Sequence, residues 1–353
     1  MTRIAIDAMG GDQAPKAIVE GAVWAAMEYN IPIELVGKLY DIERELDRID
    51  QEGIVCSVGG GIFPPKRIKV NLKNLDIKKT HASEVIEMGE APGQAIRKKK
   101  NSSIVLAVNS VVTGSSDAVV AAGSTGAAMG ASLFGLGRLH GIERPAIATV
   151  IPTMKGPLVL IDSGANTDCT PEMLYQFGLM GSVYAKSVLG IENPRVALLN
   201  IGEEAGKGDE LAKDTYKLFD ENKDELNFIG NAEGKEIFLG NCDVIVCDGF
   251  VGNVTLKTIE GVARMLFYMI KQEFYHDFIS KIIGLLVRPV LKRIYVKINY
   301  EEFGGALLLG VKGITVICHG RSSAYAIKNA VRVAYNAVEA GINKKIASYY
   351  GEI

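Results

Sequence analysis

Six short apolar runs in the chain each end in a turn of small polar residues that could hold an anion. The six turns contain carboxylates, amides, hydroxyls and one histidine, and they read Asp7-Ala8-Met9-Gly10-Gly11-Asp12, Gly123-Ser124-Thr125-Gly126, Asp162-Ser163-Gly164-Ala165-Asn166, Asn200-Ile201-Gly202-Glu203-Glu204, Asp248-Gly249-Phe250-Val251-Gly252-Asn253 and His319-Gly320-Arg321-Ser322-Ser323. Turns favour Gly, Asn, Asp and Ser anyway, so each one alone is more readily explained as structural. Together they would offer backbone N–H groups, hydroxyls and helix N-termini, which favour an anion such as phosphate.

An asparagine and a lysine are the first candidates for direct chemistry. Asn253 and Lys257 are four residues apart at the start of a helix predicted over residues 252–275, so they share a helix face. An amide and an ammonium near the positive end of a helix could hold phosphate or an oxyanion. On residue types alone, an N-cap asparagine and a solvated surface lysine explain the pair somewhat better.

His319 is the only histidine at a predicted strand end. A protonated imidazole there could assist a leaving group, although a structural histidine is an equally good interpretation. Arg321 beside it could bind a phosphate. Ser124 and Thr125 could offer hydroxyls and free N–H groups to the same anion, or could simply cap the helix that follows them.

The carboxylates of the turns are expected to act indirectly, because two carboxylates repel phosphate. Asp7 and Asp12, which flank a glycine pair, would orient a lysine or cap a helix, and Asp162 would orient the substrate. Asn166 could donate a hydrogen bond to substrate. Either Glu203 or its neighbour Glu204 could pair structurally with Lys207.

Several common motifs are missing or incomplete. No G-x-G-x-x-G, G-x-S-x-G or H-E-x-x-H sequence occurs, and residues 202–208 resemble a phosphate loop that is one residue short and lacks the Ser or Thr after its lysine. The five cysteines form no C-x-x-C pair, so reduced thiols are expected. The sequence therefore disfavours an ATPase, a serine hydrolase with the usual elbow, and a metal site.

Composition sets wider limits. The chain has 353 residues, of which 48 % are hydrophobic, and this composition excludes collagen-like and disordered proteins. Its net charge of −2 does not indicate a protein that binds nucleic acid through bulk positive charge. A signal peptide is not expected, because the carboxylate of Asp7 interrupts the first apolar stretch too early. No run of 18 apolar residues occurs that could cross a membrane as a helix. A cytoplasmic protein is expected.

Apolar runs alternate with amphipathic segments from end to end. Strands are predicted at 3–7, 31–36, 54–58, 118–122, 146–150, 158–161, 196–201, 244–247 and 314–318, and the first helices at 14–29 and 39–48. This alternation favours an α/β fold with a mostly parallel sheet. Ligands bind beyond the carboxyl ends of such strands, so the six turns are expected to line one edge. Residues 63–79 are predicted as a loop that covers or flanks this edge.

One segment differs from the rest in charge. Residues 262–298 contain seven Lys or Arg and two Asp or Glu among many apolar residues. Phe274, Phe278, Ile282 and Leu285 follow a helical spacing, and a break or turn is predicted near Gly284 and Pro289. Residues 250–300 are therefore predicted to form a projecting helical hairpin, which would be a dimer interface, a core helix pair, or a tip that inserts into anionic lipid.

The motifs at the strand ends resemble, in this order, those of the bacterial phosphate acyltransferase (PlsX) family. The nonapeptide over residues 4–12, the Asp162-x-Gly164-Ala165-Asn166 turn, the Asn200-Ile201-Gly202-Glu203-Glu204 turn and the Asp248-Gly249-Phe250-x-Gly252-Asn253 block carry the resemblance, which extends from Arg3 to about Ala340. It implies transfer of a fatty acyl group from acyl-acyl carrier protein to inorganic phosphate, which yields acyl phosphate for phospholipid synthesis.

The resemblance also implies an architecture and partners. It implies a three-layer α/β sandwich similar to phosphotransacetylases and to the isocitrate and isopropylmalate dehydrogenase group, formed as one unit over residues 1–353. A cytoplasmic homodimer with peripheral contact to an anionic membrane is expected, with no metal, organic cofactor or nucleic acid. In the hairpin, the residues predicted to meet membrane or partner are Phe274, Phe278, Lys281, Ile282, Leu285 and Arg288.

With the resemblance, the candidate residues acquire expected roles. Phosphate is already a nucleophile, so the site needs positioning and oxyanion stabilisation, and no covalent acyl-enzyme. Asn253, Lys257 and His319 are predicted to be catalytic. The residues predicted to surround phosphate or substrate are Asp7, Gly10, Gly11, Ser124, Thr125, Asp162, Asn166, Asn200, Glu203, Lys207 and Gly252.

Three other functions stay open from the sequence. A short-chain phosphotransacetylase would share the chemistry but would prefer acyl-coenzyme A. A carrier-protein or membrane binding module would bind tightly without turnover. A decarboxylating dehydrogenase follows only from analogy of fold, and no adenine-ribose signature supports it.

Overall fold

The computed structural model of the chain describes residues 1–56, 66–298 and 300–351. Eleven strands in these ranges form one sheet, ordered β10-β9-β11-β8-β7-β12-β13-β6-β1-β2-β5. The strands are β1 (Ile4–Asp7), β2 (Ile33–Gly37), β5 (Ile77–His81), β6 (Ala118–Ala121), β7 (Ala146–Pro152), β8 (Pro157–Ile161), β9 (Val196–Leu199), β10 (Phe228–Ala232), β11 (Val244–Val246), β12 (Ala306–Leu309) and β13 (Ile314–Ile317). Seven of its ten neighbour pairs are parallel, so the predicted α/β fold with a mostly parallel sheet is confirmed.

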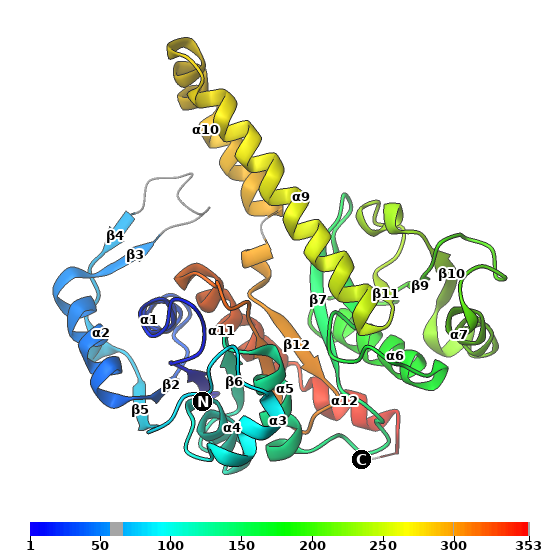
Figure 1. The fold of residues 1–353 in the computed structure, drawn as a ribbon, viewed down its shortest axis with the longest axis horizontal. Helices are drawn as coiled ribbons and strands as arrows, with labels where there is room; N and C mark the ends of the chain where they lie inside the picture. Colours follow the sequence, from blue (N-terminus) through cyan, green and yellow to red (C-terminus); the bar gives the residue numbers. More distant parts are fainter. Residues whose placement is uncertain (57–65, 299, 352–353) are drawn as a thin grey trace.

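Helices cover both faces of this sheet, as Figure 1 shows. They are α1 (Lys16–Tyr29), α2 (Leu39–Glu52), α3 (Pro92–Lys98), α4 (Ser103–Val112), α5 (Thr125–Leu136), α6 (Pro171–Ser187), α7 (Glu210–Glu221), α8 (Lys223–Leu226), α11 (Ala324–Glu339) and α12 (Ile342–Ser348), with short 3₁₀ turns η1 (Leu72–Asn74), η2 (Gly234–Phe238) and η3 (Tyr300–Phe303). Along β1, Ile4 and Ile6 belong to the buried cluster that includes α1 and α11, whereas Ala5 belongs to the cluster that includes α4 and α5. Because side chains alternate along a strand, the helices lie in two layers with the sheet between them.

The direction of the strands reverses in the middle of the sheet. Strand β7 is antiparallel to both β8 and β12, and β12 is antiparallel to β13. The group β8, β11, β9 and β10 therefore runs opposite to the group β13, β6, β1, β2 and β5. The expectation that all six polar turns share one edge is wrong, since three follow one group and three follow the other. The short links between Pro152 and Pro157 and between Leu309 and Ile314 contribute to this reversal, because parallel neighbours need a longer crossover.

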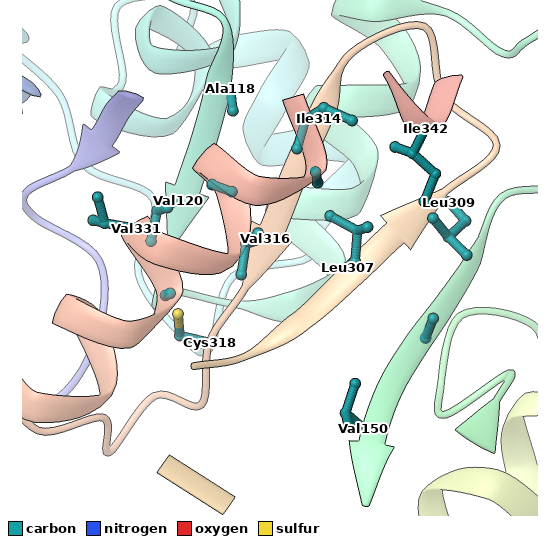
Figure 2. Packing of buried hydrophobic residues seen from close by; sticks show 14 of the residues in the cluster. Ala118, Val120, Val150, Leu307, Leu309, Ile314, Val316, Cys318, Val331 and Ile342 are labelled. Atoms are coloured by element: carbon teal, nitrogen blue, oxygen red, sulfur yellow. The ribbon is translucent and has the colours of Figure 1, made fainter. Parts of the chain in front are cut away.

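The core runs unbroken through this reversal. Figure 2 shows Val120 on β6, Val316 on β13, Leu307 on β12 and Val150 on β7 following one another across the sheet, with Val331 of α11 beside Val120. All five side chains are buried. The two halves of the sheet therefore share one hydrophobic core at the place where the strands change direction.

The segment predicted as a loop over residues 63–79 contains regular structure in its described part. Strand β4 (Lys66–Ile68) pairs with β3 (Ile54–Cys56) in a separate two-stranded sheet, and β5 extends the main sheet beside β2. Residues 57–65, which include the end of the strand predicted at 54–58, lie outside the described residues. The strands were missed because β4 and β5 are half-exposed edge strands rich in lysine and arginine, without an apolar run.

Two long helices, α9 (Gly249–Tyr275) and α10 (Phe278–Ile298), run side by side and extend away from the sheet (Figure 1). The break predicted near Gly284 and Pro289 is wrong, because both residues lie inside α10 and the turn falls at residues 276–277. Asp277 marks that turn, since its carboxylate accepts the backbone N–H of Ser280 at 2.8 Å. Gly284 instead permits close packing, since a Cβ there would lie 3.0 Å from Phe274.

The hairpin of α9 and α10 exposes many large apolar side chains. Phe278 and Leu286 are 76 % and 73 % exposed, and Met265, Ile279, Ile282, Ile283 and Leu285 are also exposed. Within the described residues, no helix combines the length and apolarity needed to cross a membrane.

Candidate active site

A cavity of about 230 Å³ lies between the start of α9 and the central strands of the sheet. Ile147 and Thr149 of β7 line it together with Ala306 of β12, and the turns after β6, β8 and β13 contribute Thr125, Ser163 and His319. The turns after β8 and β13 reach it from opposite directions along the sheet, because the two strand groups run in opposite senses. The reversal of strand direction therefore brings polar groups of both halves to one place.

Four of the predicted site residues line this cavity. They are Thr125, Asn253, Lys257 and His319, which the chain separates by up to 194 positions. Asn253 and Lys257 are one turn apart on α9, as their spacing predicted. The side-chain amide of Asn253 has no hydrogen-bond partner among the described residues and lies beside Gly164. A donor is therefore available there for a substrate.

Helix α9 is held in place at its first turn. The N-cap is Asp248, whose carboxylate accepts the N–H groups of Phe250 and Val251 at 2.9 and 3.0 Å. The N–H of Gly249 donates to the carbonyl oxygen of Asn166 at 2.6 Å. A Cβ on Gly252 would lie only 1.9 Å from the carbonyl oxygen of Asp162. Gly252 therefore acts by close approach, and it is not among the residues that line the cavity.

Helix α9 begins at Gly249, three residues earlier than predicted, so Asn253 and Lys257 lie further from its N-terminus than expected. Asn253 stands in the second turn and Lys257 in the third, whereas the field of a helix end falls off within its first turn. The expected help from the helix dipole is therefore wrong at these two side chains. Ile259 packs against the buried cluster of β8 and β11 on roughly the opposite side of the helix from Lys257, which leaves Lys257 facing the cavity.

Asp162 organises the turn that α9 rests on. Its carboxylate is buried and accepts the backbone N–H groups of Ile147, Gly164, Ala165 and Asn166 at 2.8–3.1 Å. Burial raises the pKa of this carboxyl, and the hydrogen bonds, led by that from Ala165, oppose the rise. The Nδ2 of Asn166 donates to Asp162 and to the carbonyl of Pro145. Both polar side chains are thus engaged in building the turn, and neither lines the cavity.

The turn after β1 packs against the turns after β6 and β13. The buried carboxylate of Asp7 accepts the N–H of Met9, and burial raises its pKa. A Cβ on Gly10 would lie 2.8 Å from the nitrogen of Gly123, and Gly11 has φ +105°. These residues bring the turns together without lining the cavity.

Two other groups of predicted residues have local structural contacts. Ser124 caps α5, because its hydroxyl accepts the N–H of Ala127. In the exposed turn after β9, the Nδ2 of Asn200 donates to the carbonyl of Lys207. Of the two glutamates considered as partners for Lys207, Glu203 pairs instead with Lys235 at 3.7 Å. None of Ser124, Asn200, Glu203 and Lys207 lines the cavity. Strand β11 lies between β9 and β8 and so separates the turn after β9 from the cavity, whereas the hydroxyl of Ser124 is hydrogen-bonded to the first turn of α5.

Lys257 and His319 have defined electrostatic states. The Nζ of Lys257 donates to Glu260 at 3.0 Å while the side chain stays half exposed. The Nδ1 of His319 accepts the backbone N–H of Arg321 at 3.1 Å, which leaves the proton of a neutral ring on Nε2. Burial and then the charge of Lys257 lower the pKa of His319. Both effects disfavour the protonated imidazole considered from the sequence, and they favour a neutral ring whose Nε2–H is a hydrogen-bond donor.

Some lining residues were not predicted. Glu260 could have been recognised, since it stands three positions after Lys257 on the same helix face. Thr149 and Ser163, whose hydroxyls are 2.6 Å apart, sit in or beside apolar strands that gave no signal. Cys318 also lines the cavity, but burial raises the pKa of its thiol to about 12, so no thiolate nucleophile is present. The described residues contain no group of three or more His, Cys, Asp or Glu side chains placed to hold a metal.

The arrangement is rich in donors and lacks an activated nucleophile. A cation at Lys257, an amide at Asn253, the Nε2–H of His319 and the hydroxyl of Thr125 surround one space. The positive charges of Arg264 and Arg321 also act on His319, which shows that both cations are near. Such a site can hold a tetrahedral anion and stabilise charge that develops on a neighbouring oxygen.

The state of His319 predicts a pH effect. As the pH falls through its lowered pKa, below the ordinary 6.5, the ring gains a proton on Nδ1 and loses the hydrogen bond from Arg321. We expect the ratio of the rates of the wild type and His319→Gln to be constant between pH 7 and 8 and to fall at lower pH. The protonation of phosphate also changes over this pH range, but it affects the rates of both enzymes equally and therefore cancels in the ratio. A ratio that rises on acidification would show that the imidazolium is the active form.

Comparison with known proteins gives close sequence relatives and more distant structural ones. Residues 67–345 match the family described as "Fatty acid synthesis protein". The chain is 50 % identical over 346 residues to a phosphate acyltransferase of Pelotomaculum thermopropionicum, covering 98 % of this chain and 94 % of the relative. It is 47 % identical to one from Halothermothrix orenii (96 % of each chain) and 51 % identical to one from Heliobacterium modesticaldum (96 % and 94 %).

The structural relatives confirm the predicted architecture. A phosphotransacetylase from Streptococcus pyogenes superposes with a TM-score of 0.58 at 15 % identity, covering 96 % of this chain and 94 % of the other. A branched-chain phosphotransacylase from Enterococcus faecalis gives 0.54 at 16 % identity, covering 96 % and 99 %. At this identity the likeness concerns the fold alone.

Proposed function

We propose that this chain, which belongs to the phosphate acyltransferase family, transfers a fatty acyl group from acyl-acyl carrier protein to inorganic phosphate. It is an acyltransferase of fatty acid and lipid synthesis by its family. The observation that carries the proposal is the cavity that gathers Asn253, Lys257 and His319 as donors without an activated nucleophile. Acyl phosphate formed there would feed phospholipid synthesis.

In the proposed mechanism, phosphate itself attacks the thioester. Lys257 and Thr125 hold the phosphate, and one phosphate oxygen forms a bond to the carbonyl carbon. Asn253 and the Nε2–H of His319 donate to the oxyanion. The carbon–sulfur bond then breaks, and the thiolate of the carrier receives the proton that hydrogen phosphate loses. Atoms and charge balance in this step without a metal or an organic cofactor. One such donor to the oxyanion lowers the activation free energy by about 3 kcal/mol.

This mechanism forms no covalent acyl-enzyme, and a rapid-mixing experiment tests that point. Enzyme mixed with palmitoyl-acyl carrier protein without phosphate should release no carrier thiol. A burst equal to the enzyme concentration would show that a protein side chain takes the acyl group first. The raised pKa of Cys318 supports the expected absence of a burst.

A carrier protein is the proposed donor because three cations gather at or near the cavity, whose lining also holds the carboxylates of Glu260 and Glu301. Lys257, Arg264 and Arg321 all act electrostatically on His319, and an acyl carrier protein is strongly acidic. Palmitoyl-acyl carrier protein should therefore react with higher kcat/KM than palmitoyl-coenzyme A, and salt should reduce the advantage. Faster reaction of acetyl-coenzyme A would favour a short-chain phosphotransacetylase, and tight carrier binding without turnover would favour a binding module.

The hairpin of α9 and α10 supports a second part of the proposal, which is peripheral contact of a cytoplasmic homodimer with an anionic membrane. Phe278 and Ile279 are exposed at the start of α10, beside the turn at residues 276–277 that lies away from the sheet (Figure 1), and Leu286 is exposed further along α10. Lys281 and Arg293 are nearby in sequence on the same helix. Apolar side chains beside cations favour an interface with anionic lipid. A second copy of the chain would cover the remaining apolar sides of the helices.

Membrane contact predicts a clear result in vesicle flotation. The double variant Phe278→Asp with Leu286→Asp should no longer float with vesicles that contain phosphatidylglycerol, because two carboxylates would be driven against a negative surface. The matched control is Tyr40→Asp with Met154→Asp, which replaces two comparably exposed apolar residues outside the hairpin and should still float. If the first double variant floats like the wild type, the hairpin is not the membrane contact.

A further inference from the structure

A second cavity, of about 360 Å³, opens between the two helices of the hairpin. We call it the hairpin groove. Its apolar lining comes from Phe267, Ile270 and Phe274 of α9 and from Leu285 and Leu291 of α10. Tyr295 packs edge-on against Phe267, with ring centroids 4.9 Å apart, at the end of the groove nearer the sheet. The groove is the larger of these two cavities and the more apolar in its side chains.

The catalytic cavity and the hairpin groove lie on the same face of α9. Asn253, Lys257 and Glu260 of the catalytic cavity and Phe267, Lys271 and Phe274 of the groove follow alternating steps of four and three along α9, with Arg264 at the step between the two sets. Residues at these steps form one continuous stripe along a helix, with a drift of about 20° per seven residues. The stripe is polar as far as Arg264 and mainly apolar from Phe267 onward. One helix face therefore leads from the reacting groups into the groove.

The distances along this face match a fatty acyl chain. At about 1.5 Å per residue, Phe267 lies about 15 Å and Phe274 about 26 Å along α9 from Lys257. One long lipid tail spans about half of the ~30 Å hydrocarbon core of a bilayer, or about 15 Å, and somewhat more when extended. A palmitoyl tail whose thioester sits at Lys257 would thus reach the hairpin groove, whereas an octanoyl tail would end before Phe267.

We propose that the hairpin groove binds the distal part of the acyl tail and so favours long-chain donors. This rests on the proposed function, because it places the thioester beside Lys257. The catalytic cavity mixes apolar residues such as Leu256 and Phe303 with Lys257, Glu260, Glu301 and His319, and it is smaller than the groove. The groove supplies the nearest apolar lining on that face. Lys271, Lys281 and Arg288 also line it, and their apolar stems can contact a tail.

A pair of adjacent substitutions on α9 tests this assignment. Ile270→Trp would fill the groove, whereas Met269→Trp places the same ring at the neighbouring exposed position outside it. Each methylene that loses its apolar contact weakens binding about fourfold. We expect Ile270→Trp to lower the palmitoyl-to-octanoyl ratio of kcat/KM at least tenfold, and Met269→Trp to change it less than twofold. An unchanged ratio in Ile270→Trp would overturn the proposal.

A binding experiment keeps the proposal testable if the variant misfolds. Palmitoyl-acyl carrier protein with a photoreactive group at the end of its tail should label α9 or α10 between Phe267 and Leu291 in the wild type, and unmodified palmitoyl donor should compete. Labelling confined to other elements would overturn the proposal. Competition by phosphatidylglycerol vesicles but not by palmitoyl donor would assign the groove to membrane lipid instead. The outcomes are separate from the proposed function, which fails if the wild type releases no carrier thiol from either donor.

Discussion

Replacing Lys257 with alanine should lower kcat/KM for phosphate-dependent acyl transfer by 10²- to 10³-fold. Lys257 lines the cavity together with Asn253 and His319, and its ammonium group places a positive charge there. Removing one well-placed donor to developing charge typically costs about this much. Because Lys257 is half exposed, its loss should leave the free energy of unfolding nearly unchanged. The measurement is a steady-state assay of carrier-thiol release at varied phosphate, with urea unfolding alongside.

Lys217 provides a matched control for this substitution. It is an exposed lysine on α7 that pairs with Asp214 at 3.1 Å, just as Lys257 pairs with Glu260 at 3.0 Å, and in both pairs the partners are three residues apart. Lys217→Ala should retain wild-type kcat/KM. If Lys257→Ala also retains it, the cavity is not the place where phosphate reacts.

The second large effect concerns stability and comes from Gly252→Ala. The new methyl group would lie 1.9 Å from the carbonyl oxygen of Asp162, a backbone atom that cannot rotate away. The start of α9 must then move off the turn at residues 162–166, which displaces Asn253 and Lys257 together. Overpacking of this kind costs about 3 kcal/mol or more of the free energy of unfolding. Acyl transfer should fall at least 10-fold as well, because small misplacements of positioning groups are costly.

Gly261 on the same helix is the control for this prediction. A Cβ there meets no atom within 4 Å, so Gly261→Ala should raise the free energy of unfolding by about 0.5–1 kcal/mol through the better helix propensity of alanine. Urea unfolding of both variants measures the difference. Equal stability of Gly252→Ala and the wild type would mean that α9 is not held against the Asp162 turn as described.

Much of the fold followed from hydrophobic patterning. The buried runs at β1, β6, β8 and β13 are short and apolar, and such runs separated by helical segments indicate an α/β sheet. The edge strands β4 and β5 were missed because their adjacent lysine and arginine residues are exposed, which removes the apolar signal. The reversal at β7 was also missed, although seven residues between the predicted strands 146–150 and 158–161 are too few for a parallel crossover.

The candidate site was predictable only in part, for reasons of burial and geometry. The step of four residues between Asn253 and Lys257 is visible in the sequence, and it determines their common face. The proton position on His319 is not visible, since it depends on burial and on the N–H of Arg321. Asp162, Gly10 and Gly252 were predicted to surround phosphate or substrate, but their contacts belong to the scaffold around the cavity and not to its lining.

The most direct test of the central claim measures carrier-thiol release and acyl phosphate formation together. Purified protein would be mixed with palmitoyl-acyl carrier protein and labelled inorganic phosphate over a range of phosphate concentrations. We predict thiol release that depends on phosphate, saturates, and matches the labelled acyl phosphate formed mole for mole. Thiol release at the same rate without phosphate, with no labelled product, would identify a thioesterase and contradict the account.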